Sequence, residues 1–70
     1  MSARKLFVPV TPGGTPLMYG AGALMGKRIA ANTREKAIAN LLKDAAHMPY
    51  KTWENFEKRG YTIEEYEEKQ

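Results

Sequence analysis

The longest stretch of helical periodicity in the chain covers residues 32–48. Its apolar side chains recur at the i, i+3, i+4 and i+7 spacing that gathers them on one face of a helix. Asn32 is expected to cap the first turn, while Glu35 reaches back to the cap amide. The helix must end by Met48, because Pro49 disfavours helical geometry in the residue before it. The face expected to be buried consists of Ile38, Leu41, Leu42 and Ala45.

A second, shorter helix is predicted between Thr52 and Gly60. Threonine is a favourable N-cap, and glycine reaches the left-handed conformation that ends many helices. Such an end brings the residue after the glycine back onto the last turn, so Tyr61 is expected to contact Phe56. Trp53 then faces the same side of the helix as Phe56.

Alternation of apolar side chains predicts a half-buried strand over residues 5–10. Pro9 favours an edge position or a strand end, because proline has no N–H to donate to a neighbouring strand. The following sequence TPGGTP, residues 11–16, consists of turn-forming residues. The side of the strand expected to be buried carries Leu6, Val8 and Val10.

Residues 17–26, LMYGAGALMG, are apolar but contain three glycines, which weaken any regular element. We interpret them as a long loop that merges into a second strand, which starts at Leu24 or Met25 and continues through Ala31. Loops of this length tend to be functional or disordered, and an apolar one is less often merely disordered.

The last segment, YTIEEYEEKQ, fits either a strand with Ile63 inward and Glu64 outward or a helix capped by Thr62. We favour the strand, because a sheet this small needs three strands for independent stability. The predicted fold is therefore α+β, a three-stranded antiparallel sheet with two consecutive helices in the order β-β-α-α-β. It forms one domain over residues 1–70, with fraying expected at residues 1–3 and 67–70.

Composition narrows the functional classes. The 70 residues include no cysteine, so a disulfide framework and the usual zinc sites are excluded. No stretch approaches the roughly 18 apolar residues of a membrane span, and the apolar run after Lys5 is too short for a signal peptide. We expect a cytoplasmic protein without a membrane partner, a metal or another cofactor.

Catalytic chemistry finds little support in the sequence. His47 is the only histidine and Ser2 the only serine, and Ser2 lies in a terminus expected to fray. The glycines do not fit a phosphate-binding loop, because the hydroxyl position after Gly26 and Lys27 is occupied by Arg28. We therefore expect a non-enzymatic protein, and sequestration of a small anion by the amides of this segment is the least favoured of three functions.

Charge is distributed unevenly along the chain. Residues 1–32 contain four basic and no acidic side chains, whereas seven basic and eight acidic side chains follow. If the basic residues meet on adjacent strands near Tyr19 or Trp53, they can form a surface for nucleic acid, which is the second function considered. The candidate nucleic-acid-binding residues are Arg4, Lys5, Lys27 and Arg28.

The function we favour is a small protein-binding module. The glycine-rich segment holds too many large apolar side chains for a solvated loop, so some of them are expected to be exposed and to contact a partner. That partner is a host protein or a second copy of the chain. The candidate partner-binding residues are Leu17, Met18, Tyr19, Met25 and Arg28.

The sequences GKRIAANTREKAIANLL and HMPYKTWENFEKRGY carry a resemblance over residues 26–66. This part of the chain resembles a block found in short uncharacterised proteins of tailed phages and prophages. The resemblance implies a small accessory protein that inhibits or redirects a host or defence protein by binding it. No catalytic or ligand residues come with it.

Overall fold

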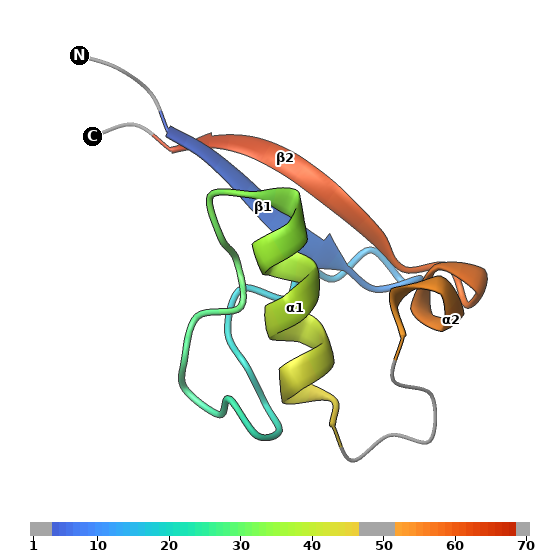
Figure 1. Cartoon of the computed structure of the whole chain (residues 1–70). Helices are drawn as coiled ribbons and strands as arrows, with labels where there is room; N and C mark the ends of the chain where they lie inside the picture. Colours follow the sequence, from blue (N-terminus) through green and yellow to red (C-terminus); the bar gives the residue numbers. More distant parts are fainter. Residues whose placement is uncertain (1–3, 47–51, 69–70) are drawn as a thin grey trace.

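The computed structural model describes residues 4–46 and 52–68 as an α+β fold. The first and last elements form an antiparallel pair, and α1 lies across one side of this ribbon, while α2 lies at the end where β2 begins (Figure 1). In chain order the elements are β1 (Arg4–Val10), α1 (Arg34–Asp44), α2 (Trp53–Lys58) and β2 (Thr62–Glu68).

Both outer strands form as predicted. Their register runs from Arg4 opposite Glu68 to Val10 opposite Thr62, so Thr62–Glu68 is a strand and not a helix. The side chains of Leu6, Val8 and Val10 are all buried, in agreement with the alternating pattern.

The second strand, predicted from Leu24 or Met25 through Ala31, is wrong, and the order is β-α-α-β with two strands in place of three. The segment leading to α1 meets β1 at a single bridge, between Ala31 and Phe7. Just before it, the N–H groups of Ile29 and Ala30 both point to the carbonyl of Met18, at 2.8 and 3.4 Å. Such convergence on one oxygen is incompatible with the alternating bonds of a ladder, and the cap of α1 follows at once.

The turn after β1 is confirmed. The N–H of Gly14 donates to the carbonyl of Thr11 at 2.9 Å, and the Thr11 hydroxyl accepts from the N–H of Thr15 at 3.0 Å. Gly14 has a φ of +89°, which glycine adopts at little cost. The chain then returns beside β1, where the N–H of Leu17 donates to the carbonyl of Pro9.

The N-terminus of α1 lies one residue later than expected. Thr33, not Asn32, is the N-cap, and its hydroxyl accepts from the N–H of Lys36 at 3.1 Å. Both residue types cap helices well, but the cap position carries an extended backbone, and here Thr33 has it, with φ −133° and ψ 152°. Glu35 consequently falls in the first turn without the capping-box position.

The predicted apolar face of α1 is confirmed in part. Leu41 and Ala45 are buried, whereas Ile38 and Leu42 are half-buried. Ala37, which the periodicity did not select, is also fully buried. The main core cluster consists of Ile29, Leu41, Ala45 and Phe56.

The short helix α2 begins and ends as predicted. Thr52 is its N-cap, and Gly60, at φ +100°, follows the C-cap. The N–H of Tyr61 donates to the carbonyl of Phe56 at 3.1 Å, and the two rings meet edge to face with centroids 5.0 Å apart. Trp53 packs against the same cluster as Phe56, so these aromatic side chains face one side.

Leu41→Ala should lower the free energy of unfolding by about 2 to 5 kcal/mol, because it removes a side chain that is only 3% exposed and leaves a cavity. A 70-residue domain has little stability to spare, so the variant should be largely unfolded at 37 °C. Urea unfolding followed by circular dichroism measures the change. Exposed Lys43, in the same helix, is the control, and Lys43→Ala should change stability by less than about 0.5 kcal/mol. A loss below 1 kcal/mol for Leu41→Ala would place the buried face elsewhere.

Candidate functional site

Residues 17–28, hereafter the glycine loop, leave β1 and return to it before α1 begins. A single antiparallel bridge joins Tyr19 to Arg28 near the base of the loop, and the N–H of Gly20 donates to the carbonyl of Lys27 at 2.8 Å. Within the tip, the N–H of Met25 donates to the carbonyl of Gly22 at 3.0 Å. The loop is thus folded on itself, not extended.

The glycine loop is fastened to the C-terminal end of α1 by Asp44. The Asp44 carboxylate accepts three backbone hydrogen bonds, from the N–H groups of Ala21 (3.2 Å), Gly22 (2.8 Å) and Leu24 (2.9 Å). The backbone carbonyl of Asp44 accepts a fourth, from Ala23, at 3.2 Å. Four consecutive residues of the loop are therefore bound to one helix residue. We refer to this arrangement as the Asp44 clasp.

The clasp explains an acidic residue at an unfavourable place. The C-terminal end of a helix carries partial negative charge, so a carboxylate there is normally destabilising. Three N–H donors directed at the Asp44 carboxylate offset that repulsion, and hydrogen bonds to an ionised group are stronger than neutral ones. The amides that could have sequestered a small anion are bonded to the protein's own carboxylate.

Gly20 is required where the loop passes the helix end. A Cβ added at this position would lie 2.2 Å from the carbonyl oxygen of Leu24 and 2.6 Å from a carboxylate oxygen of Asp44. Neither neighbour can retreat without breaking the clasp, so only glycine fits here.

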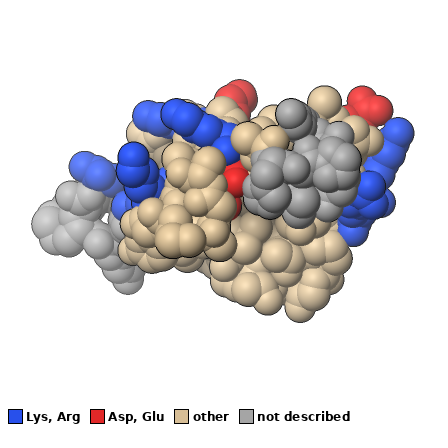
Figure 2. Space-filling view, turned by 90° about the horizontal axis from the view of Figure 1, so that it is seen from below, with Lys and Arg blue, Asp and Glu red and all other residues tan. Residues whose placement is uncertain are grey.

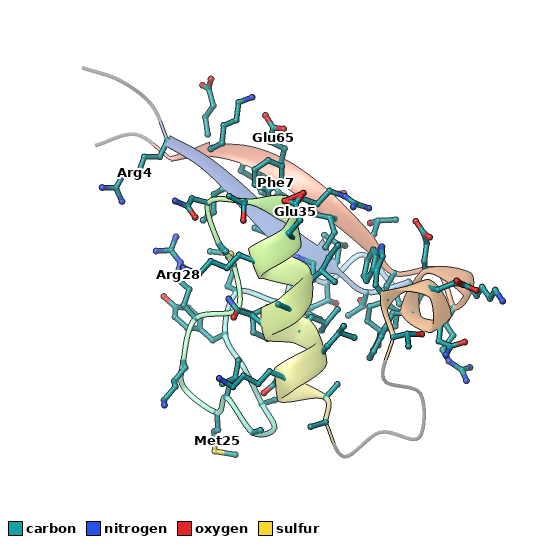
Figure 3. The ribbon with its side chains drawn as sticks, viewed as in Figure 1. Arg4, Phe7, Met25, Arg28, Glu35 and Glu65 are labelled. Carbon is teal, nitrogen blue, oxygen red and sulfur yellow. The ribbon has the colours of Figure 1, made fainter. Side chains whose placement is uncertain are left out.

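The structure divides the five predicted partner-binding residues into two groups. Leu17 and Met18 are half-buried, and each packs against one of the two buried clusters. Tyr19 and Met25 are 63% and 74% exposed, and Arg28 is exposed beside Tyr19 across their bridge. Figure 3 shows Met25 at the far end of the loop.

Three of the four predicted nucleic-acid-binding residues meet at one cleft. The cleft has a volume of about 160 Å³ and lies between the start of β1 and the segment that precedes α1. Arg4 and Arg28 project to the same side of the molecule (Figure 3), whereas Lys27 does not line the cleft. No acidic side chain is among its lining residues, which are Arg4, Lys5, Leu6, Arg28, Ala30, Ala31 and Asn32.

A second hollow lies between the glycine loop and the helices. It has a volume of about 250 Å³ and a mostly apolar wall, with the Asp44 carboxylate as its acidic group. Because that carboxylate is engaged in the clasp, we assign no ligand to this hollow. Its wall consists of Leu17, Ala21, Gly22, Leu41, Asp44, Ala45, Phe56 and Tyr61.

Acidic side chains concentrate on β2. The Nζ atom of Lys5 lies 3.6 Å from a carboxylate oxygen of Glu65 across the strand pair, so this lysine is partly neutralised. The hydroxyl of Tyr66 donates to the carboxylate of Glu64 at 2.5 Å, and this hydrogen bond raises the pKa of Tyr66 above its usual value of 10.0. One strand of the ribbon is therefore basic at its start, and the other is acidic.

The lower face of the molecule presents a broad area of residues that are neither acidic nor basic, with Lys and Arg at both ends (Figure 2).

Within residues 4–46 and 52–68, no three carboxylate or imidazole side chains come together as they would to hold a metal ion. No helix in that part of the chain is long and apolar enough to span a membrane. His47 and Ser2 lie outside the described residues.

Asp44 is the residue that sequence reasoning missed. It had a signal, since it is an acidic residue at the very end of its helix, where the dipole disfavours a carboxylate, and the glycine-rich segment has many backbone amides. Comparison of the chain with protein-family models, with curated proteins and with solved structures gave no match.

Gly20→Ala should detach the glycine loop from α1. The added methyl group overlaps the Leu24 carbonyl, so we expect a loss of about 1 to 3 kcal/mol in unfolding free energy. Hydrogen exchange at the amides of Gly22 and Leu24 should accelerate. Gly13→Ala is the matched control, because its Cβ would meet only Thr11 Oγ1, at 3.9 Å. Equal behaviour of the two variants would contradict the close approach at Gly20.

Proposed function

We propose that this protein is a small, non-enzymatic binding module that contacts another protein through the exposed end of the glycine loop. One observation carries the proposal. Tyr19 and Met25 are strongly exposed on a segment whose backbone is held by the Asp44 clasp.

Exposed apolar side chains on an ordered backbone support the interpretation of this surface as a binding site. A mobile loop loses conformational entropy when it binds, whereas the clasp has already ordered four consecutive residues of this loop. Tyrosine offers a large, rigid and amphipathic surface, and methionine adapts its shape to a partner. Both are enriched in the centres of protein interfaces.

Charge around these side chains indicates the kind of partner. Lys27 and Arg28 are exposed in the same loop, and residues 1–32 contain no acidic side chain. A complementary surface has an apolar pocket for Tyr19 or Met25 and a rim of aspartate and glutamate. Opposite charges of this kind accelerate association and exclude basic partners. An inhibitory role toward a host or defence protein, as the phage resemblance implies, stays a prediction.

Tyr19→Ala should weaken the complex by at least about 1 kcal/mol and leave the thermal midpoint nearly unchanged, because this side chain is 63% exposed. The measurement starts with affinity capture from host lysate at high salt, followed by calorimetric titration of the captured protein with wild type and variant. Sedimentation of the protein alone reports a homodimer, which the same substitution should dissociate.

Two further variants sharpen the Tyr19 test. Asp44→Asn keeps the shape of the side chain but removes its charge, so it should weaken the clasp and reduce affinity without touching the partner. Tyr66→Ala removes another exposed aromatic side chain, on β2, and should leave affinity unchanged. If Tyr19→Ala leaves the chain unfolded, or if Tyr66→Ala has the larger effect on affinity, the glycine loop is not the contact surface.

Nucleic-acid binding is the second candidate function, and the cleft that brings together Arg4 and Arg28 favours it. Tyr19 lies beside Arg28, which places an aromatic ring near the cations. The cleft is small, however, and the Glu65 carboxylate already partly neutralises Lys5. It offers about three cations to phosphate groups.

If nucleic acid is the ligand, affinity for duplex DNA should fall about 40-fold between 50 and 200 mM salt, as expected for three phosphate contacts. Fluorescence anisotropy with labelled duplex and single-stranded oligonucleotides measures this dependence. Arg4→Ala should then weaken nucleic-acid binding and leave capture of the protein partner intact, because Arg4 lies outside the glycine loop. Salt-independent affinity, or no effect of Arg4→Ala, would argue against this function.

A further inference from the structure

Among the residues that the structure describes, strand β2 pairs with another segment on one side only, where β1 lies. The backbone groups of Phe7 exchange two hydrogen bonds with Ala31, at 2.7 and 3.1 Å, so they point away from β2. Bonding direction alternates along a strand, so the neighbours of Phe7, Leu6 and Val8, direct their backbone groups toward β2.

The register extends this alternation to the other strand. Tyr66 and Glu64 lie opposite Leu6 and Val8, so their backbone groups bond to β1. The N–H and carbonyl groups of Ile63, Glu65 and Glu67 must therefore point away from β1. In residues 4–46 and 52–68, no other segment pairs with this outer edge.

An unpaired strand edge invites a further strand, and here it belongs to a sheet that is one strand short. A two-stranded sheet is marginally stable, and a third strand strengthens it by pairing the free backbone groups. Extended peptides bind many proteins by adding to such edges.

Charge decides which strand can occupy the edge. Four of the seven residues of β2 are glutamate. Pairing with β2 of a second copy would set these carboxylates side by side, which is unfavourable. A basic strand would instead place opposite charges side by side. The chain already has such a pairing, because Arg4 and Lys5 lie opposite Glu68 and Glu67.

We propose that the outer edge of β2 accepts an extended, basic segment of another protein as the third strand of the sheet. Basic residues in that segment lie opposite Glu64, Glu65 and Glu67, and apolar residues lie opposite half-buried Ile63 and exposed Tyr66. The contact of Glu65 with Lys5 leaves half of its side chain exposed, so its carboxylate still attracts a cation.

This surface is separate from the glycine loop. β2 forms the far side of the ribbon from the loop, and β1 and α1 lie between them (Figure 1). The proposal therefore does not rest on the function assigned to Tyr19 and Met25.

The test uses the full chain and a peptide with blocked ends, Lys-Val-Lys-Lys-Val-Thr, in labelled form. The control is the same peptide N-methylated at alternate residues, those opposite Ile63, Glu65 and Glu67. It keeps every charge but cannot donate hydrogen bonds to the strand. We expect the unmodified peptide to bind at least about tenfold more tightly in fluorescence anisotropy, since methylation of the three residues opposite Ile63, Glu65 and Glu67 removes three backbone donors. Hydrogen exchange at the amides of Ile63, Glu65 and Glu67 should slow when it binds.

Variants of the protein check the same edge. Glu65→Pro removes one outward N–H without touching the bonds to β1, so affinity should fall severalfold, whereas Glu65→Gln keeps that N–H and should lose less. Tyr19→Ala should leave peptide affinity unchanged. Equal affinity for both peptides, the absence of binding, or protection of the edge amides in the protein alone would overturn the proposal. If Glu65→Pro fails to fold, the peptide pair decides by itself.

Discussion

The carboxylate of Asp44 is the contact on which the shape of this protein most depends. It binds three amides of an apolar, glycine-containing loop and so joins the first third of the chain to the end of α1. Without these bonds, the loop would have to leave its amides to water or pair as a strand. The loop N–H groups stabilise a carboxylate at the negative end of the helix. The carboxylate in turn accepts hydrogen bonds from N–H groups that would otherwise need another acceptor.

The clasp has a consequence for the sheet. Backbone groups that turn toward Asp44 cannot extend a ladder, so the segment between the glycine loop and α1 forms only one bridge with β1, at Ala31. The ribbon of β1 and β2 then depends on packing, and the cluster of Leu6, Val8 and Ala30 with half-buried Met18 covers one of its faces. Within residues 4–46 and 52–68 the buried apolar side chains form two small clusters, and a chain of this size buries a limited fraction of its surface.

The arrangement also separates the exposed surfaces by chemistry. Met18 turns inward to the core, and the next side chain, Tyr19, turns outward beside Arg28. Basic side chains from the start of β1 and the base of the loop line one cleft, whereas the glutamates lie along β2. The two surfaces proposed for binding therefore differ in charge, and opposite charges select different partners.

Local rules were sufficient for the regular elements. Alternation predicted that Leu6 and Val8 would be buried in β1, and the glycine at the end of α2 predicted the contact between Tyr61 and Phe56. These features depend on neighbours within about six residues, which a sequence displays directly. The N-cap of α1 was one residue off, because Asn32 and Thr33 can both cap a helix and the conformation of the preceding backbone decides between them.

Only the tertiary structure decided the course of the glycine loop. Its apolar residues suited a strand, a core segment or an exposed patch, and the choice depended on Asp44, 20 residues beyond Leu24. The same contact decided that Tyr19 and Met25 are exposed while Leu17 and Met18 are half-buried. The sequence by itself determined which residues were candidates for binding. Long-range hydrogen bonds, which have no period and no local signature, determined which of them face solvent.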